Sequence, residues 1–389
     1  AIPCSGRGTR PTPPFMTDAP VAAPLKTPLH GRHVALGAKM VSFGGWEMPL
    51  QYSGITEEHL ATRASAGLFD VSHMGQIKVT GDSATELLES LLPTDLSHLD
   101  VGRQRYSFLT LDTGGILDDL MISRFEDHYL LVVNASNKHQ DFNHIAGRLP
   151  ADCTAELMDN RSLLALQGPL AREVMSRLCP DLTTMRFMDT MDAEIEGIKC
   201  QAFCSGYTGE DGFELATNKD DALKLAQLLL DQTEVQPAGL GARDCLRLEA
   251  GLCLHGNDIH PNITPVAAGL SWAIPASRRK GGSKSGGFPG SEPILLELEN
   301  GPSLTRVGIQ PEGRAPVRAH SEIVNPTGEP VGEVSSGSYG PTVGRPIAMG
   351  YVRSTCSAVG TDLRAIVRGK PLSVKICPLP FIKHNYRRH

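Results

Sequence analysis

Two successive carboxylates, Asp118 and Asp119, follow the glycines Gly114 and Gly115 and are the first candidates for chemistry in the sequence. The glycines allow a tight turn or a close approach of the backbone to another group. Successive side chains of an extended segment point to opposite faces, so these two acids cannot act together as one dyad. The pattern predicts either one acid that faces inward at a site, while the other faces solvent or caps the turn, or a turn with Asx caps and no site.

A second candidate is the stretch 206–214, which reads GYTGEDGFE and contains three glycines and three acids. Tyr207 and Glu214 lie at the two ends of this predicted loop and can converge on one ligand. A carboxylate accepts two parallel N–H bonds, which suits the amino-imino edge of a flat heterocycle such as a purine or a pterin. The composition is also typical of a solvated hairpin tip, and the sequence alone leaves both interpretations open.

The third candidate is a pair of arginines, Arg243 and Arg247, in a helix predicted after the glycine-rich turn 239–241. Residues four apart share one face of a helix. Arg243 lies near the helix start, where the dipole also favours an anion, so a ligand carboxylate can dock there. Alternatively, Asp244 pairs with Arg247 or another helix neighbour, and the group is structural.

Other reactive side chains give weaker signals. His73 is a candidate base, but a lone histidine is more often simply hydrogen-bonded, and the adjacent Met74 is expected to pack. The nine cysteines lack metal-ligand spacing; Cys200 and Cys204 come closest, without a second pair. The sequence therefore predicts reduced thiols and no metal site.

Composition limits the class of protein. The chain has 389 residues, of which 40% are hydrophobic and 21% charged, and its net charge is -6. These values are ordinary for a globular protein and provide no basic field for nucleic acid or an anionic membrane surface. No apolar run is long enough to span a bilayer. Residues 1–21 carry Arg7 and Arg10 but only one acid, Asp18, which is typical of a mitochondrial leader or of a disordered tail.

The elements that must position these residues alternate between strand and helix from residue 25 to about residue 274. Strands are predicted at 77–80, 129–134 and 163–167, and helices at 84–92, 169–178 and 220–230. This mixed order without repeats predicts an α+β fold rather than a doubly wound sheet.

A change of composition follows at 275–290, where glycine, serine, proline and the basic run 278–280 predict a solvated loop or linker. Beyond it, short strands are expected at 305–309, 322–324, 331–335, 348–352 and 363–376, with a hairpin tip at 368–371. Several short strands at this spacing predict a small all-β barrel or sandwich.

Taken together, the motifs resemble those of the aminomethyltransferase family, the T-proteins of the glycine cleavage system. They run in order as KMVSFGGW (39–46), LFDVSHM (68–74), GGILDD (114–119), LALQGP (164–169), GYTGEDG (206–212), ARDCLRLEAG (242–251), GND (256–258), TP (264–265), AMGY (348–351) and NY (385–386). Each motif is short, but so many in fixed order are specific, and the resemblance covers residue 25 to the C-terminus.

The resemblance implies a fold and a domain division. Residues 1–24 would be a leader, the remnant of a mitochondrial transit peptide. A multi-layer α+β folate-binding portion would span 25–290, and a C-terminal β-barrel domain 291–389, the domains being arranged around a central cavity. The implied location is the mitochondrial matrix.

The resemblance also implies an activity. Tetrahydrofolate would be the co-substrate that accepts the one-carbon unit, and the aminomethyl group on lipoylated H-protein the donor, in functional association with the other glycine cleavage components. The products would be 5,10-methylenetetrahydrofolate, ammonia and dihydrolipoyl H-protein. No metal, nucleic acid or membrane is implied.

Residue roles follow from the same resemblance. Asp119 matches the family's key aspartate, close to folate N10, and Glu214 matches the carboxylate that holds the pterin edge. Arg243 matches the arginine that neutralises the glutamate tail of folate. The remaining matched pocket residues are Met74, Tyr106 and Tyr207, and the C-terminal Tyr386 and Arg387, which would reach the tail region.

The sequence departs from the family at two places, and rival functions remain. Ala267 stands where many relatives have Glu, and Pro275-Ala276 replaces a Gly-Lys, which puts the local loop conformation in question. A relative serving iron–sulfur assembly would carry KGCYxGQE, whereas residues 205–210 read SGYTGE. A folate-dependent demethylase that uses another sulfur- or amine-linked donor would have the same pocket, and a non-enzymatic interaction protein would not need Asp119.

Overall fold

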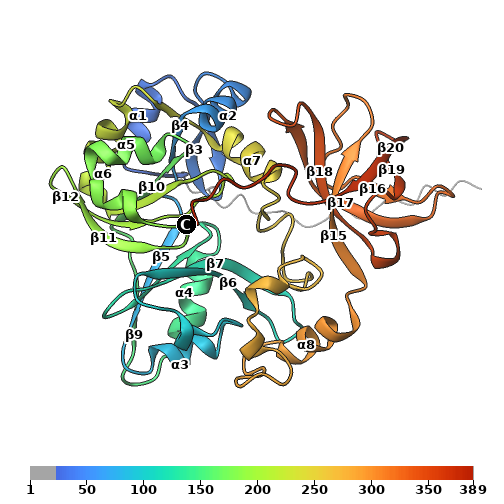
Figure 1. The fold of residues 1–389 in the computed structure, drawn as a ribbon, viewed down its shortest axis with the longest axis horizontal. Coiled ribbons are helices and arrows are strands. Elements are labelled where there is room, and N and C mark those ends of the chain that lie inside the picture. The colour runs from blue at the N-terminus through green and yellow to red at the C-terminus, as the bar shows by residue number, and fades with distance from the viewer. Residues whose placement is uncertain (1–22, 389) are drawn as a thin grey trace, which may run out of the picture.

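A computed structural model describes residues 23–388, so the predicted leader lies almost entirely outside the described residues. The chain forms two stacked α+β layers and a separate β-barrel (Figure 1). The predicted α+β class with a C-terminal barrel is therefore confirmed. The arrangement around a central cavity and the domain boundaries at 24 and 290 stay predictions.

The first large sheet has six strands and carries the Glu214 strand near its middle. Its order is β11 (Thr190–Ile195), β12 (Ile198–Phe203), β13 (Gly212–Asn218), β10 (Arg161–Gln167), β4 (Ala66–Asp70) and β14 (Val235–Pro237). Helices α5 (Ala171–Leu178) and α6 (Lys219–Leu230) cover one face. In β10, Leu164 and Leu166 pack under these helices, whereas Leu163 and Ala165 face the opposite side. This period of two is what a strand buried on both faces requires.

The second large sheet has five strands and carries the two aspartates. Its order is β6 (Arg103–Thr110), β7 (Ile116–Arg124), β8 (Tyr129–Val133), β5 (Gly75–Thr80) and β9 (Thr154–Leu157). Helices α3 (Ala84–Glu89) and α4 (Lys138–Ala146) pack on its outer face, where Leu120 and Ile122 of β7 are buried among them.

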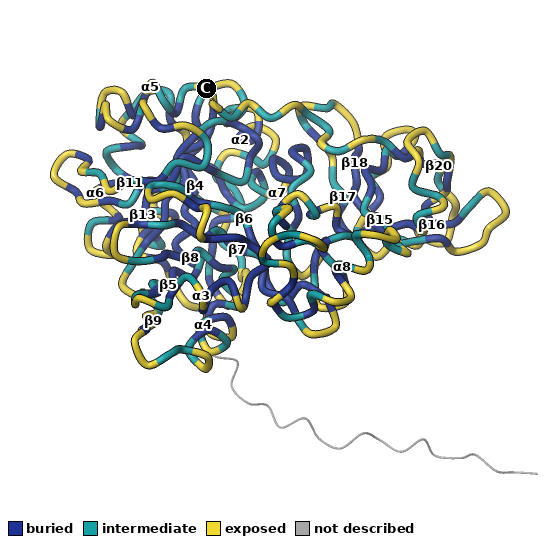
Figure 2. The backbone as a smooth tube through the Cα atoms, turned by 60° about the horizontal axis from the view of Figure 1, so that its bottom comes forward, coloured by how far each residue is buried: buried dark blue, intermediate teal, exposed yellow. Residues whose placement is uncertain are grey.

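The inner faces of the two sheets meet in a shared core. Phe125 and Leu130 from the second sheet are buried there with Phe69 and Phe203 from the first. The layers therefore run helices, sheet, sheet, helices. Burial follows this order in Figure 2, where the interior strands are buried and the outer loops are exposed.

A three-stranded sheet and three helices complete the α+β part of the chain. The strands are β1 (Leu25–Lys26), β3 (Trp46–Gln51) and β2 (Lys39–Phe43), and the helices are α1 (His30–Ala35), α2 (Ile55–Ala64) and α7 (Leu240–Glu249). Helix α7 contacts β3 on one side and β17 and β18 of the barrel on the other. It thus connects the α+β layers to the barrel, as Figure 1 shows.

The C-terminal strands form a closed barrel, which decides between the two predicted all-β architectures. The order is β15 (Leu304–Pro311), β18 (Arg345–Arg353), β17 (Pro330–Gly340), β16 (Glu322–Val324), β19 (Asp362–Val367) and β20 (Lys370–Cys377). The predicted hairpin tip is confirmed between β19 and β20. Arg368 and Gly369 both have positive φ there, 50° and 75°, as a tight two-residue hairpin turn requires.

The prediction of a solvated loop at 275–290 is wrong for two of its basic residues. Arg278 is only 4% exposed and donates to the carbonyl of Glu89 at 2.6 Å. Lys284 Nζ lies 2.8 Å from both carboxylate oxygens of Glu89 and 3.2 Å from Asp95. Local composition did not reveal these partners, which lie 189 to 195 residues earlier in the chain. The following helix α8 (Ser291–Asn300) buries Ile294 against Phe108 and Ile116 of the second sheet.

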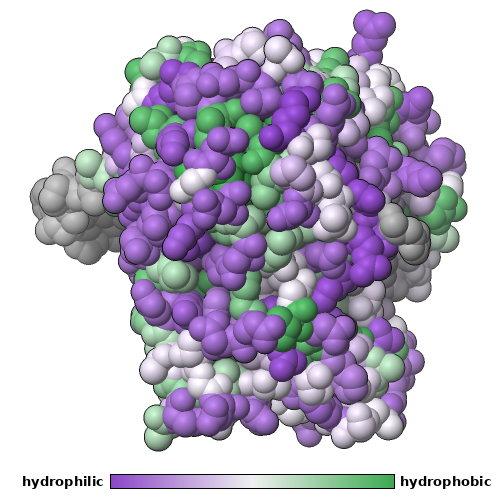
Figure 3. Space-filling model, turned by 60° about the vertical axis from the view of Figure 1, so that its left-hand side comes forward, coloured by the Kyte–Doolittle hydropathy of each residue, from purple (hydrophilic) through white to green (hydrophobic). Residues whose placement is uncertain are grey.

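Surface properties agree with the predicted class. The face in Figure 3 is largely hydrophilic, with smaller apolar patches between polar side chains. Over residues 23–388, no helix has the length and hydropathy needed to cross a bilayer. The eight cysteines of the described range are all free thiols, as predicted.

Candidate active site

Asp119 lies in the middle of β7 and is held from both neighbouring strands. Tyr106 of β6 donates its hydroxyl to one carboxylate oxygen at 3.0 Å. Asn134, directly after β8, donates its Nδ2 to the other oxygen at 2.8 Å. The Asp119 side chain is partly exposed, whereas residues before and after it in β7 are buried. The carboxylate is therefore fixed in direction but open on one side.

Asp118 points to the opposite face, as the alternation of a strand predicts. It is fully buried on the side of α4, and it accepts hydrogen bonds at 2.8 Å from Nδ2 of both Asn134 and Asn137. The expectation that the acid on the other face would meet solvent or cap the turn is thus wrong, because Asp118 is buried. The turn itself ends at residue 115, before the strand begins. Asn134 also touches both acids, so the two carboxylates are coupled through one amide.

Electrostatics at Asp119 favour a carboxyl that titrates close to neutrality. Burial raises its pKa to about 6, and the negative charge of Asp118 acts in the same direction. The Asn134 hydrogen bond, His255 and the Tyr106 hydrogen bond oppose this effect on the pKa. Asp119 is consequently anionic above about pH 6, in a place where water only partly screens its charge.

A second group of side chains combines an arginine, an aromatic ring and a carboxylate. The guanidinium of Arg243 lies 4.7 Å from the centroid of the Tyr207 ring, and the Tyr207 hydroxyl donates to the Cys253 carbonyl. Glu214 accepts a hydrogen bond from the Ser205 hydroxyl at 3.0 Å. Arg243 lies over the Tyr207 ring and its charge acts on Glu214, so the three side chains share one region. Whether Tyr207 and Glu214 converge on one ligand stays a prediction.

The charges of this group are only partly compensated. Burial raises the pKa of Glu214 and lowers the pKa of Arg243, and each charge opposes the other's shift. One Arg243 nitrogen, Nη1, is buried without a hydrogen-bond partner in the described residues. An arginine stays charged in proteins, so a buried and unsatisfied donor of this kind favours an anionic ligand group.

Arg247 shares its helix with Arg243 but has a different environment. It is 2% exposed and bonds to Asp244 at 2.8 Å, to Asp258 at 2.6 Å and to the Ser336 hydroxyl at 2.8 Å. The alternative interpretation of an Asp244–Arg247 pair is confirmed. Arg247 fastens α7 to the barrel, which leaves Arg243 as the arginine available to a ligand.

Met74 and His73 lie at the edge of the core between the sheets. Met74 is partly buried and packs against the cluster that contains Phe203 and Ala242, next to Arg243 in the chain. His73 is 3% exposed, and burial lowers its pKa to about 4. The ring is therefore neutral at physiological pH and edge-on to Phe43.

The C-terminal residues form a separate group around Phe187. The Tyr386 ring stacks on Phe187 with centroids 4.0 Å apart, and the Arg387 carbonyl accepts from the Phe187 amide at 2.7 Å. The Arg387 guanidinium donates to the carbonyl of Thr183. Whether Tyr386 and Arg387 also reach the tail of a ligand stays a prediction.

The segment leading to these residues returns from the barrel to the α+β layers, as the dark red trace in Figure 1 shows. The Asn385 amide donates to the Gly209 carbonyl at 2.8 Å, and its side chain donates to Glu210 at 2.9 Å. Nε2 of His384 lies 2.8 Å from the Ala250 carbonyl, after the last residue of α7. The chain end thus fastens the 206–214 loop to the end of α7.

Sequence reasoning missed several residues of this site. The role of Asn134 could not be predicted from the sequence, because its partners Asp118 and Asp119 lie sixteen and fifteen residues earlier, across the β7–β8 pairing. Its position directly after a predicted strand was the available signal. Trp272 was also missed: it is 64% exposed and stacks on Tyr106 with centroids 5.4 Å apart.

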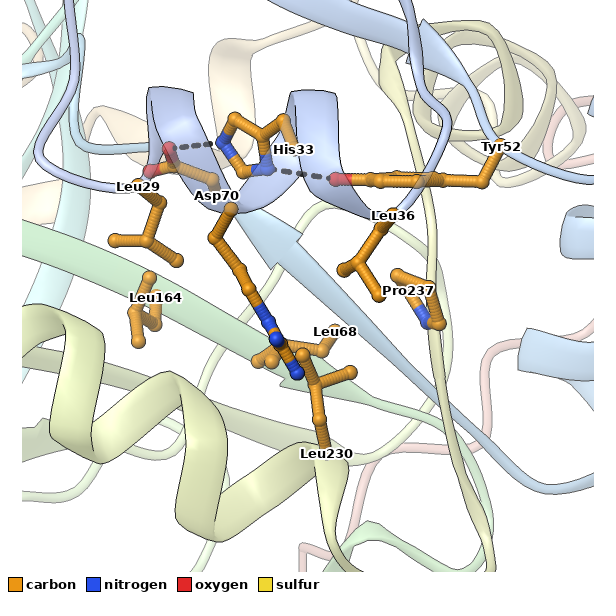
Figure 4. Close-up of a pocket in the computed structure, with 10 residues that line it drawn as sticks. Leu29, His33, Leu36, Tyr52, Leu68, Asp70, Leu164, Leu230 and Pro237 are labelled. Atoms are coloured by element: carbon orange, nitrogen blue, oxygen red, sulfur yellow. Dashed lines mark hydrogen bonds and ion pairs between the residues drawn. The ribbon is translucent and has the colours of Figure 1, made fainter.

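A small cavity near the N-terminus is not this site. Figure 4 shows His33 between the Asp70 carboxylate and the Tyr52 hydroxyl, at 2.8 and 2.9 Å. The cavity volume is about 10 Å³, close to the space of one water molecule. It cannot hold a heterocycle, and the triad fastens α1 to β4. Within residues 23–388, no three His, Cys, Asp or Glu side chains are grouped to bind a metal ion.

Comparison with known proteins identifies the family. Residues 29–278 match the GCVT N-terminal domain, and residues 305–383 match the glycine cleavage T-protein C-terminal barrel domain. The chain belongs to the glycine cleavage T-protein family. The family resemblance drawn from the ordered motifs is thereby confirmed, together with the enzyme class that it implied.

Individual relatives of the T-protein family cover nearly the whole chain. "Aminomethyltransferase, mitochondrial" of Flaveria trinervia is 44% identical over 372 residues, covering 93% of this chain and 90% of the relative. The protein of the same name from Dictyostelium discoideum is 41% identical over 382 residues, covering 93% and 94%. The crystal structure of glycine cleavage system aminomethyltransferase T from Bartonella henselae superposes with a TM-score of 0.87 at 42% identity, covering 93% and 99%. These relatives do not favour the demethylase alternative.

Proposed function

We propose that the chain transfers the one-carbon unit of the aminomethyl group on lipoylated H-protein to tetrahydrofolate. The products are 5,10-methylenetetrahydrofolate, ammonia and dihydrolipoyl H-protein. The observation that carries this proposal is Asp119, a partly exposed carboxylate fixed by Tyr106 and Asn134. Family membership supplies the reaction class, and this carboxylate supplies a group suited to it.

The residues around Asp119 offer complementary contacts for a folate. Glu214 can accept the amino-imino edge of the pterin, since only Ser205 occupies its carboxylate among the described residues. Tyr106, Tyr207 and Met74 provide the walls of the pocket. The buried, unsatisfied Nη1 of Arg243 suits the anionic glutamate tail. Tyr386 and Arg387 extend the binding region toward the C-terminus.

The chemistry needs few groups. N5 of tetrahydrofolate attacks the methylene carbon as the carbon–sulfur bond breaks, and the electron pair leaves with the dihydrolipoyl sulfur. Closure onto N10 then expels ammonia, and the two protons lost from N5 and N10 go to the sulfur and to the amine. An iminium-like carbon develops positive charge on this path, which the anionic Asp119 stabilises. Positioning of the two partners accounts for several kcal/mol of the barrier, on the order of that measured for oriented reactants.

The reaction is placed in the mitochondrial matrix, together with the other glycine cleavage components. Two curated relatives bear mitochondrial names, which supports this location. Protease protection of the chain in intact and in ruptured mitochondria tests it. Digestion of the chain in intact organelles would exclude the matrix.

The decisive test is formation of 5,10-methylenetetrahydrofolate from aminomethylated H-protein and tetrahydrofolate, with each partner omitted in turn. Asp119→Asn keeps the shape but removes the charge, so turnover should fall by at least about a hundredfold while folate affinity changes modestly. Asp112→Asn is the matched control, because Asp112 is exposed in the turn before β7.

Two results would contradict the proposal. Product formation that does not depend on H-protein, but proceeds from another sulfur- or amine-linked methyl donor, would favour a demethylase. Equal turnover of Asp119→Asn and Asp112→Asn would remove Asp119 from the reacting centre and leave the site unassigned.

A further inference from the structure

Asp141 is a buried carboxyl that the proposed reaction does not use. It lies on α4, is 0% exposed, and both its carboxylate oxygens are buried without a hydrogen-bond donor in the described part of the chain. An ionised carboxylate in such a place costs several kcal/mol, on the order of the penalty for an unpaired buried charge. The geometry therefore favours a neutral carboxyl at Asp141.

Asp118 is the buried acid that acts most strongly on Asp141. Its hydrogen bond and its charge both raise the pKa of Asp141, and Asp118 is itself 0% exposed. The Asp118 oxygens accept three hydrogen bonds. Two come from Nδ2 of Asn134 and Nδ2 of Asn137, and the third comes from the backbone N–H of Asn134. Asp118 thus behaves as the carboxylate of the pair, and Asp141 is left as the acid that donates.

The surrounding charges agree with this assignment. Burial, the hydrogen bond and charge of Asp118, and the charge of Asp119 together raise the pKa of Asp141 to about 9. The ionisable groups that act on Asp141 from β7 are these two acids. Nδ1 of His255 lies 3.6 Å from a carboxylate oxygen of Asp118. On α4 itself, Lys138 turns to Asp159 at 3.3 Å, and burial lowers the pKa of His144.

The pair connects to the reacting centre through one residue. Asn134 bonds to Asp118 on one face of β7 and to Asp119 on the other, each at 2.8 Å. If Asp141 lost its proton, two anions would lie in contact and Asp118 would have to move. Asn134 would follow, and with it the direction of the Asp119 carboxylate.

We propose that Asp141 is a positioning residue that stays protonated and donates a hydrogen bond to Asp118, thereby fixing Asn134 and Asp119. Asp141 touches no reacting atom and acts through these neighbours. The inference rests on the proposed function only in taking Asp119 as the catalytic carboxylate, because the protonation of Asp141 is a property of the ligand-free protein.

Three variants separate the donor role from mere packing. Asp141→Asn keeps a donor toward Asp118 but cannot ionise. Asp141→Leu has a similar shape and no donor. Gln140→Leu is the matched control, because Gln140 is the exposed neighbour on the same helix. Single-turnover rates, KM for tetrahydrofolate and complete pH profiles are measured for each variant, and infrared difference spectra are recorded without ligand.

The conservative variant should retain the function. Asp141→Asn is expected to stay within about twofold of the parent rate near pH 7, because the lost hydrogen bond is replaced by another. Any loss of rate that the parent shows near pH 9, where Asp141 ionises, should be absent from this variant. Asp141→Leu should lower the rate about tenfold with little change in KM, since it removes a hydrogen bond to a charged group.

Two readouts need no activity. The parent should show the carbonyl stretch of a protonated carboxyl at pH 8, and Asp141→Asn should lack it. The folded state also holds a proton that an unfolded carboxyl of pKa 3.8 releases, so between this value and about 9 unfolding releases a proton. Stability must then fall as pH rises through this window, and the fall should be smaller in Asp141→Asn.

An equal loss of rate in Asp141→Asn and Asp141→Leu would overturn the donor role. So would the absence of the protonated-carboxyl band from the parent protein. If Asp141→Leu does not fold, the pH profile of Asp141→Asn and the infrared band still decide. If the parent protein transfers no one-carbon unit at all, the proposed function fails, and the band alone then decides whether Asp141 is protonated.

Discussion

Replacing Asn134 by alanine tests whether one amide sets the ionisation of Asp119, the carboxyl that we propose to be catalytic. Asn134 Nδ2 lies 2.8 Å from an oxygen of Asp119, and this bond lowers the carboxyl pKa against the raising effects of burial and of Asp118. A hydrogen bond to a charged group contributes about 1.5–3 kcal/mol, and the lower end applies because water can partly replace it. That energy corresponds to a change of about one in pKa.

Asn134→Ala should therefore raise the pKa of Asp119 from about 6 to about 7. The reaction needs the ionised carboxylate, so the rate falls as pH decreases through this pKa. At pH 6 the ionised fraction should drop from about one half to about one tenth, which lowers the rate about fivefold. Well above pH 7 both proteins should be largely ionised, and the ratio of their rates should approach its high-pH limit.

The assay is the single-turnover rate at saturating tetrahydrofolate and H-protein, measured across the acid limb. Asn137→Ala is the control, since Asn137 bonds to Asp118 at 2.8 Å but makes no hydrogen bond to Asp119. Its acid midpoint should move much less. An Asn134→Ala rate that is reduced by the same factor at every pH would refute the reasoning, because it would mean that Asn134 acts by contact or packing and not through the Asp119 charge.

Three further substitutions test the remaining assignments. Glu214→Gln should weaken tetrahydrofolate binding by about tenfold, measured by calorimetry, because a charged acceptor becomes neutral; an unchanged affinity would place the pterin elsewhere. Arg243→Ala should raise KM more for a folate with its glutamate tail than for one without it, and equal increases would make the residue structural. Lys284→Met should lower the free energy of unfolding by about 1–2 kcal/mol, because it leaves the buried pair of Glu89 and Asp95 without its cation, and thermal melts with unchanged folate affinity should confirm this.

Much of the fold could be predicted from local pattern. Strand β10 has the length and apolar run expected of a strand buried on both faces, and the 368–371 tip has the residues of a tight turn. The same alternation separated Asp118 from Asp119. What local pattern could not supply was the partner across a sheet or layer, such as Asn134 for both acids or Asp141 on the covering helix. Those contacts depend on strand pairing and helix packing, which no short window of sequence contains.

The loop at 275–290 is a second case in which local sequence could not predict distant partners. Its glycines and basic residues predicted solvent exposure, because charge and flexibility usually accompany each other. In the structure, Arg278 is buried and donates to the Glu89 carbonyl, and Lys284 pairs with the buried carboxylates of Glu89 and Asp95, which lie 195 and 189 residues earlier in the chain. To predict the burial of this loop, one would have to know that the carboxylates of Glu89 and Asp95 are buried and need a cation. Burial of these acids is a property of the folded chain, not of a local stretch of sequence.

The return of the chain end to the 206–214 loop has a consequence for biosynthesis. Domains fold from the N-terminus as they leave the ribosome, and the two sheets are complete once α7 has emerged. The Gly209 carbonyl and the Glu210 carboxylate, however, receive their bonds from Asn385, which is translated after the whole barrel. A nascent chain can thus have its sheets and its barrel in place while the Tyr207 loop is still unfastened. Fastening of this loop therefore depends on the segment after the barrel, so a chain cut between residues 377 and 385 should fold its sheets and its barrel but leave the loop without these two bonds.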